Sequence, residues 1–179
     1  MATGWTLDTA DRCIEVNLEL EELQRRLIIF SLAHYQDDAI EVKDVVKMPG
    51  HAGFAYGFTV QTASAIDKWY IRLPPPGVKL QGTADVLRQV AALSVMPDSV
   101  PHCTVKWSGD DPQWFGRPYF IVPQLEGDVV KLAGDGWVEA LEQSARVGMA
   151  QQAIDALVKI HRMDWREAHY LGEPMAFED

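Results

Sequence analysis

The stretch from Pro49 to Pro76 reads PGHAGFAYGFTVQTASAIDKWYIRLPPP, and it decides the fold. Phe54 to Thr62 and Lys68 to Leu73 have the β-branched and aromatic composition of strands, and Ala63 to Asp67 forms a short polar turn between them. Pro74-Pro75-Pro76-Gly77 ends the second strand, because proline has no N–H to give to a strand ladder. The stretch therefore predicts an antiparallel hairpin followed by a loop.

Upstream of this hairpin, the residues from Ile40 to Met48 alternate as a partly buried strand does, which extends the hairpin to three strands. Before Asp37-Asp38, apolar residues recur at helical spacing from an Asn17 cap to about Tyr35. These residues are Leu20, Leu23, Leu27 and Phe30. We expect an amphipathic helix that precedes the three strands.

Downstream, Thr83 is positioned to cap a helix from about Ala84 to Val95. Two further strands are expected near Cys103 to Trp107 and Arg117 to Pro123, separated by the turn-rich segment Ser108 to Pro112. The order of three strands, one helix and two strands predicts an α+β fold with a five-stranded antiparallel sheet and one inserted helix.

A long helical pattern covers Trp137 to His161, and we expect a break near Gly148. We divide the chain into a helical extension at 1–36, a strand-rich lobe at 37–127 and the beginning of a helical C-terminal lobe at 128–179. The apolar stripe of Ile154, Leu157 and Val158 predicts self-association or a partner chain that covers this helix.

The composition excludes several classes of protein. The 179 residues are 47% hydrophobic and 23% charged, and the formal net charge is −10 with no basic run, which argues against nucleic-acid binding. No apolar stretch is long enough to span a membrane, and the first residues lack the features of a signal sequence. Cys13 and Cys103 match no metal or redox spacing. We expect a cytoplasmic protein with reduced thiols.

Six motifs occur in an order that resembles the aminoglycoside phosphotransferase family, over about residues 40 to 165. The resemblance is to its Arg-x-Pro-Pro branch, which includes kinase-like domains related to hydroxyacyl-CoA metabolism and acyl-CoA dehydrogenases. The motifs are GHAGFAYGFT at 50–59, WYIRLPPPG at 69–77, DVLRQVAAL at 85–93, Val100-Pro101, GRPYFIV at 116–122 with Glu126-Gly127, and His161 with Asp164. The resemblance implies that residues 37–127 form a protein-kinase-like small lobe.

The resemblance also implies ATP as the cofactor, with Mg in the intact enzyme, and a phosphate loop that includes Gly50, His51, Ala52, Gly53 and Phe54. On spacing alone, these glycines also fit an ordinary β-turn.

Arg72 takes the place of the family's strand-three lysine and would face the α- and β-phosphates, with Lys68 as a reserve on the same face. An ordinary strand-end arginine is the alternative. Gln89 stands where the family places a glutamate, and Asp85, one turn earlier, is a substitute candidate or a residue that compensates the helix dipole. Gln124 and Glu126 belong to the segment that would hold adenine, where Pro123 removes one N–H donor or ends an edge strand.

The residues that complete phosphoryl transfer are missing from this sequence. Asn17 is its only asparagine, so the family's catalytic Asp-x-x-x-x-Asn motif is absent, and we assign no catalytic or metal-binding residue. His161 to Asp164 looks like a helix end rather than a catalytic loop. The missing parts are contiguous in the family, so a truncated or split protein is the expectation.

Three functional interpretations follow. The first is the ATP-binding portion of a kinase-like phosphotransferase that acts on a hydroxyl of an aminoglycoside-like antibiotic or a metabolite, inactive as this chain. The second is a non-catalytic nucleotide-binding, regulatory or oligomerisation module, favoured by Gln89, Pro123 and the missing asparagine. The third is an unrelated α+β structural domain.

Overall fold

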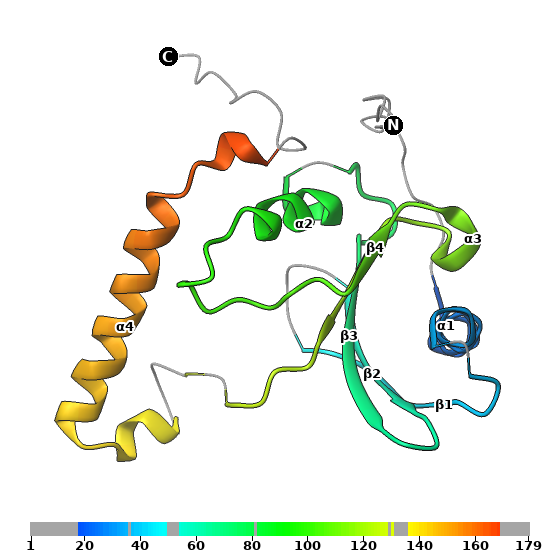
Figure 1. Ribbon diagram of the computed structural model, residues 1–179, viewed down its shortest axis with the longest axis horizontal. Helices are drawn as coiled ribbons and strands as arrows, with labels where there is room; N and C mark the ends of the chain where they lie inside the picture. The colour runs from blue at the N-terminus through cyan, green and yellow to red at the C-terminus, as the bar shows by residue number, and fades with distance from the viewer. Residues whose placement is uncertain are drawn as a thin grey trace.

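The computed structural model describes residues 18–35, 37–49, 54–80, 82–128, 130 and 136–168. Within these ranges the chain has an α+β fold, as predicted, with a five-stranded antiparallel sheet (Figure 1). The elements are, in order, α1 (Leu20–Tyr35), β1 (Glu41–Lys47), β2 (Phe54–Gln61), β3 (Ile66–Leu73), a 3₁₀ turn (Gly82–Ala84), α2 (Val86–Ser94), β4 (Trp107–Gly109), α3 (Pro112–Phe115), β5 (Tyr119–Pro123), a 3₁₀ turn (Trp137–Ala140), α4 (Gln143–His161) and a 3₁₀ turn (Trp165–Glu167).

The strands lie in the order β1-β2-β3-β5-β4, and every neighbouring pair is antiparallel. The β2–β3 hairpin is the longest regular pairing, from Phe54 opposite Leu73 to Gln61 opposite Ile66. Its turn is closed by Thr62, whose backbone N–H donates to the carbonyl of Ala65 at 2.9 Å. The predicted hairpin is therefore confirmed, and it forms the centre of the sheet.

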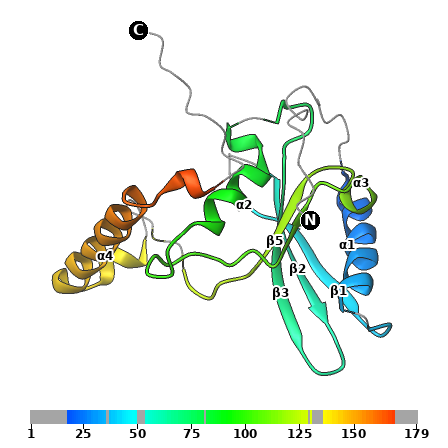
Figure 2. The ribbon, with the colours of Figure 1, turned by 45° about the horizontal axis from the view of Figure 1, so that its top comes forward.

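Helix α1 covers one face of the sheet (Figure 2). Its Leu23, Leu27 and Phe30 are fully buried and share one core with Ile71 of β3 and Ile121 of β5. Burial of each such side chain contributes roughly 1.5–3 kcal/mol. The apolar residues that recur at helical spacing in the sequence thus form the stripe that holds α1 against the sheet.

Helix α2 covers the opposite face, where Val86 packs against Phe120 and Val122 of β5. Its cap differs from the prediction. Asp85, not Thr83, is the N-cap residue, and its Oδ1 accepts the backbone N–H groups of Leu87 and Arg88 at 3.1 and 3.2 Å. The helix starts two residues late because the 3₁₀ turn at 82–84 occupies the expected first turn.

The connection between β4 and β5 was also predicted incorrectly. The strand expected at Cys103 to Trp107 begins only at Trp107, and the segment expected to be a turn contains the short helix α3. Asp111 caps α3 by accepting the N–H of Gln113 at 2.9 Å. Gly116 ends the helix with a φ of 70°, a left-handed conformation that glycine adopts without strain.

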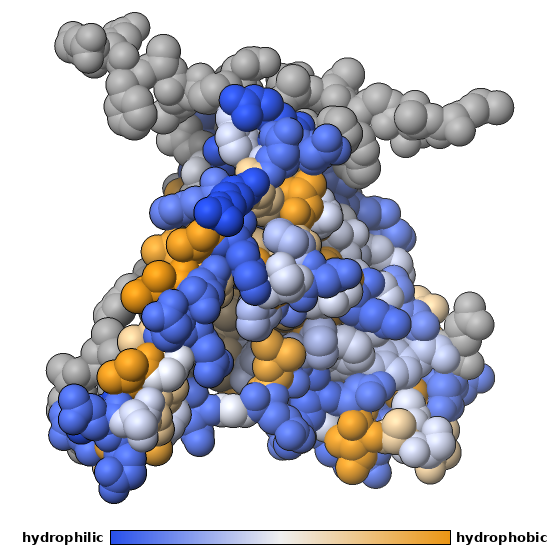
Figure 3. Space-filling model, turned by 60° about the vertical axis from the view of Figure 1, so that its left-hand side comes forward, coloured by the Kyte–Doolittle hydropathy of each residue, from blue (hydrophilic) through white to orange (hydrophobic). Residues whose placement is uncertain are grey.

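Helix α4 lies apart from the sheet, beyond α2 (Figure 1). It runs through Gly148 without interruption, so the expected break is absent there, and the irregular residues lie at Leu141 and Glu142 instead. No residue of α4 is buried, and the side of the molecule that carries it exposes apolar patches among polar ones (Figure 3). Within the described residues, no helix has both the length and the hydrophobicity needed to cross a membrane.

Candidate functional site

The candidate site is the α2 side of strand β3. Ile71 and Leu73 point into the α1 core, whereas Tyr70 packs with the α2 cluster of Val86, Phe120 and Val122. Side chains alternate along a strand, so Arg72 and Lys68 share the face of Tyr70. The structure thus places two cations and an aromatic ring along one face of β3.

Tyr70 lies over a glycine on the neighbouring strand. Gly57 of β2 is the direct partner of Tyr70 in the register. A Cβ atom at Gly57 would lie 3.3 Å from Cε1 of Tyr70 and 3.4 Å from Sδ of Met48. A larger residue here would have to displace one of these side chains, so Gly57 makes room for the tyrosine ring.

Helix α2 brings Gln89 to this side of the sheet. Val86 is buried against β5 and Val90 packs beside it, and Gln89 lies one helical turn after Val86. Asp85 is the N-cap residue of α2. Its carboxylate is engaged with the first N–H groups of α2, as expected for a residue at the positive end of a helix.

The segment after β5 runs beside the other end of this face. Pro123 is paired with Trp69, and Gln124 donates its backbone N–H to the carbonyl of Lys68 at 2.9 Å. That N–H belongs to the sheet and is not available to a ligand. The next donors along the chain, from Leu125 and Glu126, lie on exposed residues, and Leu125 is 62% exposed.

Of the predicted phosphate loop, Gly50, His51, Ala52 and Gly53 lie outside the described residues. Phe54 is the first residue of β2, and its ring packs against the α1 core, 4.3 Å from Nζ of Lys47. The side chain of Phe54 is therefore on the opposite face of the sheet from Arg72. The structure brings Arg72, Lys68, Gln89 and Gln124 to one side of the sheet and turns Phe54 away from them.

Tyr70 was not identified from the sequence as a site residue. The signal was present in the alternation of Lys68, Tyr70 and Arg72, which puts an aromatic residue between two cations. A glycine in the interior of the preceding strand was the second signal, because it marks a close approach.

The residues at the other candidate positions have structural roles. The expected helix end is confirmed, because α4 stops at His161 and Asp164 accepts the N–H of Arg166 at 3.1 Å in the turn that follows. Cys103 is a free, half-buried thiol, and Cys13 lies outside the described residues. No group of three or more His, Cys, Asp or Glu that could hold a metal ion occurs in the described part of the chain.

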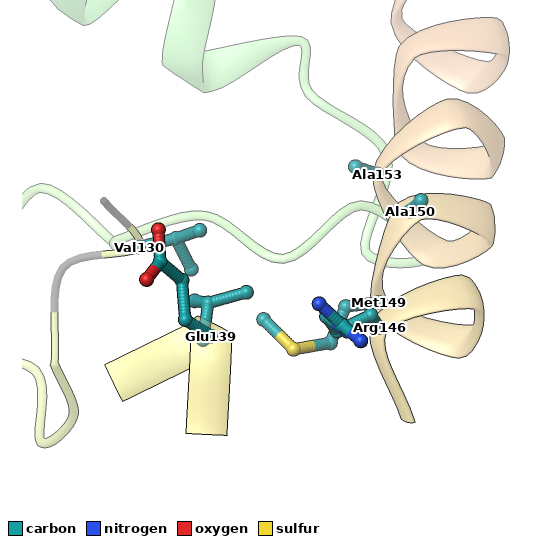
Figure 4. Close-up of a pocket in the computed structure, with 7 residues that line it drawn as sticks. Val130, Glu139, Arg146, Met149, Ala150 and Ala153 are labelled. Carbon is teal, nitrogen blue, oxygen red and sulfur yellow. The ribbon is translucent and has the colours of Figure 1, made fainter. Parts of the chain in front are cut away.

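Two surface cavities lie beside α2 and α4. One of about 430 Å³ lies between α2 and the segment at 102–108 and includes Cys103 in its wall. The other, of about 680 Å³, lies between the turn at 137–140 and α4. Figure 4 shows Met149 extending from α4 toward Val130 and Glu139, with Arg146 at the rim. Neither cavity is lined by a residue that the sequence singled out as a site residue.

Comparison with known proteins assigns no relative to this chain: no family model, no curated protein sequence and no solved structure matches it.

Proposed function

We propose that this chain is the ATP-binding portion of a kinase-like phosphotransferase. The observation that carries the proposal is the composition of one sheet face, with Arg72 and Tyr70 on β3, Gln89 on the helix above it and Gln124 at the end of β5. Cation, aromatic ring and chain segment follow one another along this face, so the cation can meet the phosphates while the ring and the chain segment meet the base of a nucleotide.

Each part has a chemical role in this proposal. The guanidinium of Arg72 pairs with phosphate oxygens through two parallel hydrogen bonds. The ring of Tyr70 offers a flat surface for a base, and stacking of this kind contributes about 1–3 kcal/mol. Leu125 and Glu126 follow the last sheet bond of Gln124 and supply the backbone groups that meet the base edge.

The sheet topology also supports the proposal. A five-stranded antiparallel sheet with one helix inserted between the third and fourth strands is the arrangement that the resemblance implied. The acceptor would be a small molecule with a hydroxyl group, an aminoglycoside-like antibiotic or a metabolite. This chain has no Asp-x-x-x-x-Asn motif, so we expect it to bind nucleotide without transferring phosphate.

The exposed side of α4 favours a second candidate, a regulatory or oligomerisation module. Ile154, Leu157 and Val158 are 55, 50 and 40% exposed and lie along one side of the helix. Apolar stripes of this kind on a folded protein mark contacts with another chain. We propose that a second copy of this chain or a partner covers α4, which is compatible with nucleotide binding at the sheet.

Titration calorimetry with Mg-ATP tests the nucleotide proposal. We expect binding by the wild type and a loss of affinity of about tenfold or more in Arg72→Ala, because a charge-assisted bidentate contact contributes roughly 1.5–3 kcal/mol. Arg88→Ala is the matched control, since Arg88 is an exposed arginine on α2. Equal affinities for the two variants, or no binding by the wild type, would reject the proposal.

A further inference from the structure

The cavity between α2 and the segment at 102–108 is separate from the residues assigned to nucleotide binding, since none of those that the structure describes lines it. Its volume is about 430 Å³, and small-molecule sites in proteins begin at about 300 Å³. All the residues of its wall belong to the described range 82–128. The cavity is therefore large enough for a ligand built on one aromatic ring.

The lining residues of this cavity divide by exposure into two chemical groups. The half-buried ones are five apolar or sulfur-containing side chains and one histidine, namely Val90, Leu93, Met96, Cys103, Val105 and His102. The exposed ones are all polar, namely Ser94, Asp98, Thr104, Lys106 and Ser108. The cavity thus has an apolar interior and a polar mouth.

The walls of the cavity are fixed by contacts that involve no ligand. Val90 on one wall and Cys103 and Val105 on the other pack against the α2 cluster. The backbone N–H of Lys106 donates to the carbonyl of Ile121 at 2.8 Å, which ties the second wall to β5. Both walls are therefore held on the sheet, and the space between them is part of the fold.

His102 supplies one hydrogen-bond acceptor to the half-buried lining. Its Nδ1 lies 2.7 Å from the carbonyl oxygen of Val100, and a carbonyl only accepts, so Nδ1 carries the ring proton. In the neutral imidazole Nε2 is then an acceptor, and no group among the described residues donates to it. The charged groups lie elsewhere: Nζ of Lys106 is 5.6 Å from the ring centroid of Trp107, and Asp98 is exposed at the mouth.

We propose that this cavity binds a small, uncharged aromatic molecule that carries one O–H or N–H donor, of the phenol or indole type. The ring lies between the apolar side chains of the two walls, where the sulfur atoms of Met96 and Cys103 make favourable contacts with an aromatic ring. The donor of the ligand meets Nε2 of His102. The half-buried lining offers no counter-charge, so an ionic ligand would lose its hydration there without compensation.

Chemical-shift mapping of the wild-type chain with phenol as the probe tests the location and the ligand class. The methyl resonances of Val90, Leu93, Met96 and Val105 should shift and saturate, with a Kd of about 1 mM or tighter. Toluene has the same size without the donor and should bind about fivefold more weakly. Benzoate should leave these resonances unchanged. No saturable shift of these methyls, or equal affinities for phenol and toluene, overturns the proposal.

His102→Phe keeps a ring at this position and removes the acceptor, so its affinity for phenol should fall about fivefold, to that for toluene. His161→Phe is the matched control, because His161 is an exposed histidine at the end of α4. Leu93→Trp fills the cavity and should abolish the binding of both probes. Equal affinities for phenol in His102→Phe and His161→Phe overturn the role of the histidine.

The thiol of Cys103 gives a second readout that does not depend on the folding of a cavity variant. In a Cys13→Ser chain, Cys103 is the only cysteine. Phenol should slow its modification by a thiol reagent, and toluene at the same concentration should slow it less, because each ligand covers the cavity wall in proportion to its occupancy. A rate that phenol does not change overturns the proposal.

Discussion

Trp69 donates its indole N–H to the hydroxyl of Tyr35 at 2.7 Å, and Tyr35 in turn donates to Oδ2 of Asp67 at 2.9 Å. This chain of hydrogen bonds joins the last residue of α1 to β3. Tyr35→Phe leaves a partly buried indole N–H without its acceptor and a carboxylate without its donor. We expect a loss of about 1–3 kcal/mol in the free energy of unfolding, measured by urea denaturation.

Ser94→Ala is the control for this change, because the hydroxyl of Ser94 donates to the carbonyl of Ala91 at 2.8 Å on an exposed helix surface. Its effect should stay within about 0.5 kcal/mol. Equal stability of Tyr35→Phe and the wild type would mean that the link does not hold α1 on the sheet.

Asp44 has a φ of 53° and lies where the register between β1 and β2 shifts, between Lys43 and Val46. Aspartate tolerates this left-handed conformation, glycine adopts it freely and β-branched residues resist it. Asp44→Val should lower the free energy of unfolding by about 1–2 kcal/mol, and Asp44→Gly should leave it equal or higher. Denaturant titration of both variants measures the free energy of unfolding. A valine variant as stable as the glycine variant would show that the backbone at position 44 is not strained.

Stability should decrease at alkaline pH because of buried phenols. Burial, together with the charge of Asp111, raises the pKa of Tyr119 to about 12, above the ordinary value near 10. The phenol therefore ionises more easily in the unfolded chain. Its contribution is complete below about pH 10 and is lost as the pH rises toward 12. Between pH 8 and 11.5, the free energy of unfolding should decrease more steeply in the wild type than in Tyr119→Phe. The same pH dependence in both proteins would contradict the raised pKa of Tyr119.

The sequence predicted most of the fold where the pattern was long and locally consistent. The apolar spacing of α1 and the strand pair from Phe54 to Leu73 agree with the structure to within a few residues. Cys103 and Val105 look like a strand because both pack against the α2 cluster, but the first ladder bond comes only at Lys106, whose N–H donates to Ile121. Burial against the α2 cluster therefore gave Cys103 and Val105 a strand-like alternation, although this part of the chain is not paired in the sheet.

Local chemistry explains the other errors. Thr83 and Asp85 are both good cap residues, but Thr83 lies inside the 3₁₀ turn at 82–84, so Asp85 caps the helix. The glycine at 148 costs about 1 kcal/mol, which is too little to interrupt a helix of 19 residues rich in alanine. In the site, the alternation along β3 was readable, but which face Phe54 would occupy depended on the register with Leu73.

The exposed side of α4 should control association. Ile154→Glu with Leu157→Glu places two charges on the apolar stripe without touching a buried residue, since α4 has none. We expect the apparent mass from light scattering at high concentration to fall to that of one chain. Gln151→Glu with Gln152→Glu, at exposed polar positions of the same helix, should leave the mass unchanged. A wild type that stays monomeric at every concentration would exclude self-association.

Gly57 should control nucleotide affinity through the position of the Tyr70 ring. In Gly57→Val, the new side chain meets Cε1 of Tyr70 and Sδ of Met48 at distances that force one of them to move. If the ring stacks on the base, its displacement should raise Kd for Mg-ATP by about fivefold or more, and Tyr70→Ala should do the same. Gly109→Ala is the matched control, because its Cβ would lie 3.6 Å from the hydroxyl of Tyr119, an ordinary contact on the far edge strand. Calorimetry that gives one Kd for Gly57→Val, Gly109→Ala and the wild type would show that the base does not lie on Tyr70, whereas selective weakening in Gly57→Val and Tyr70→Ala would locate it there.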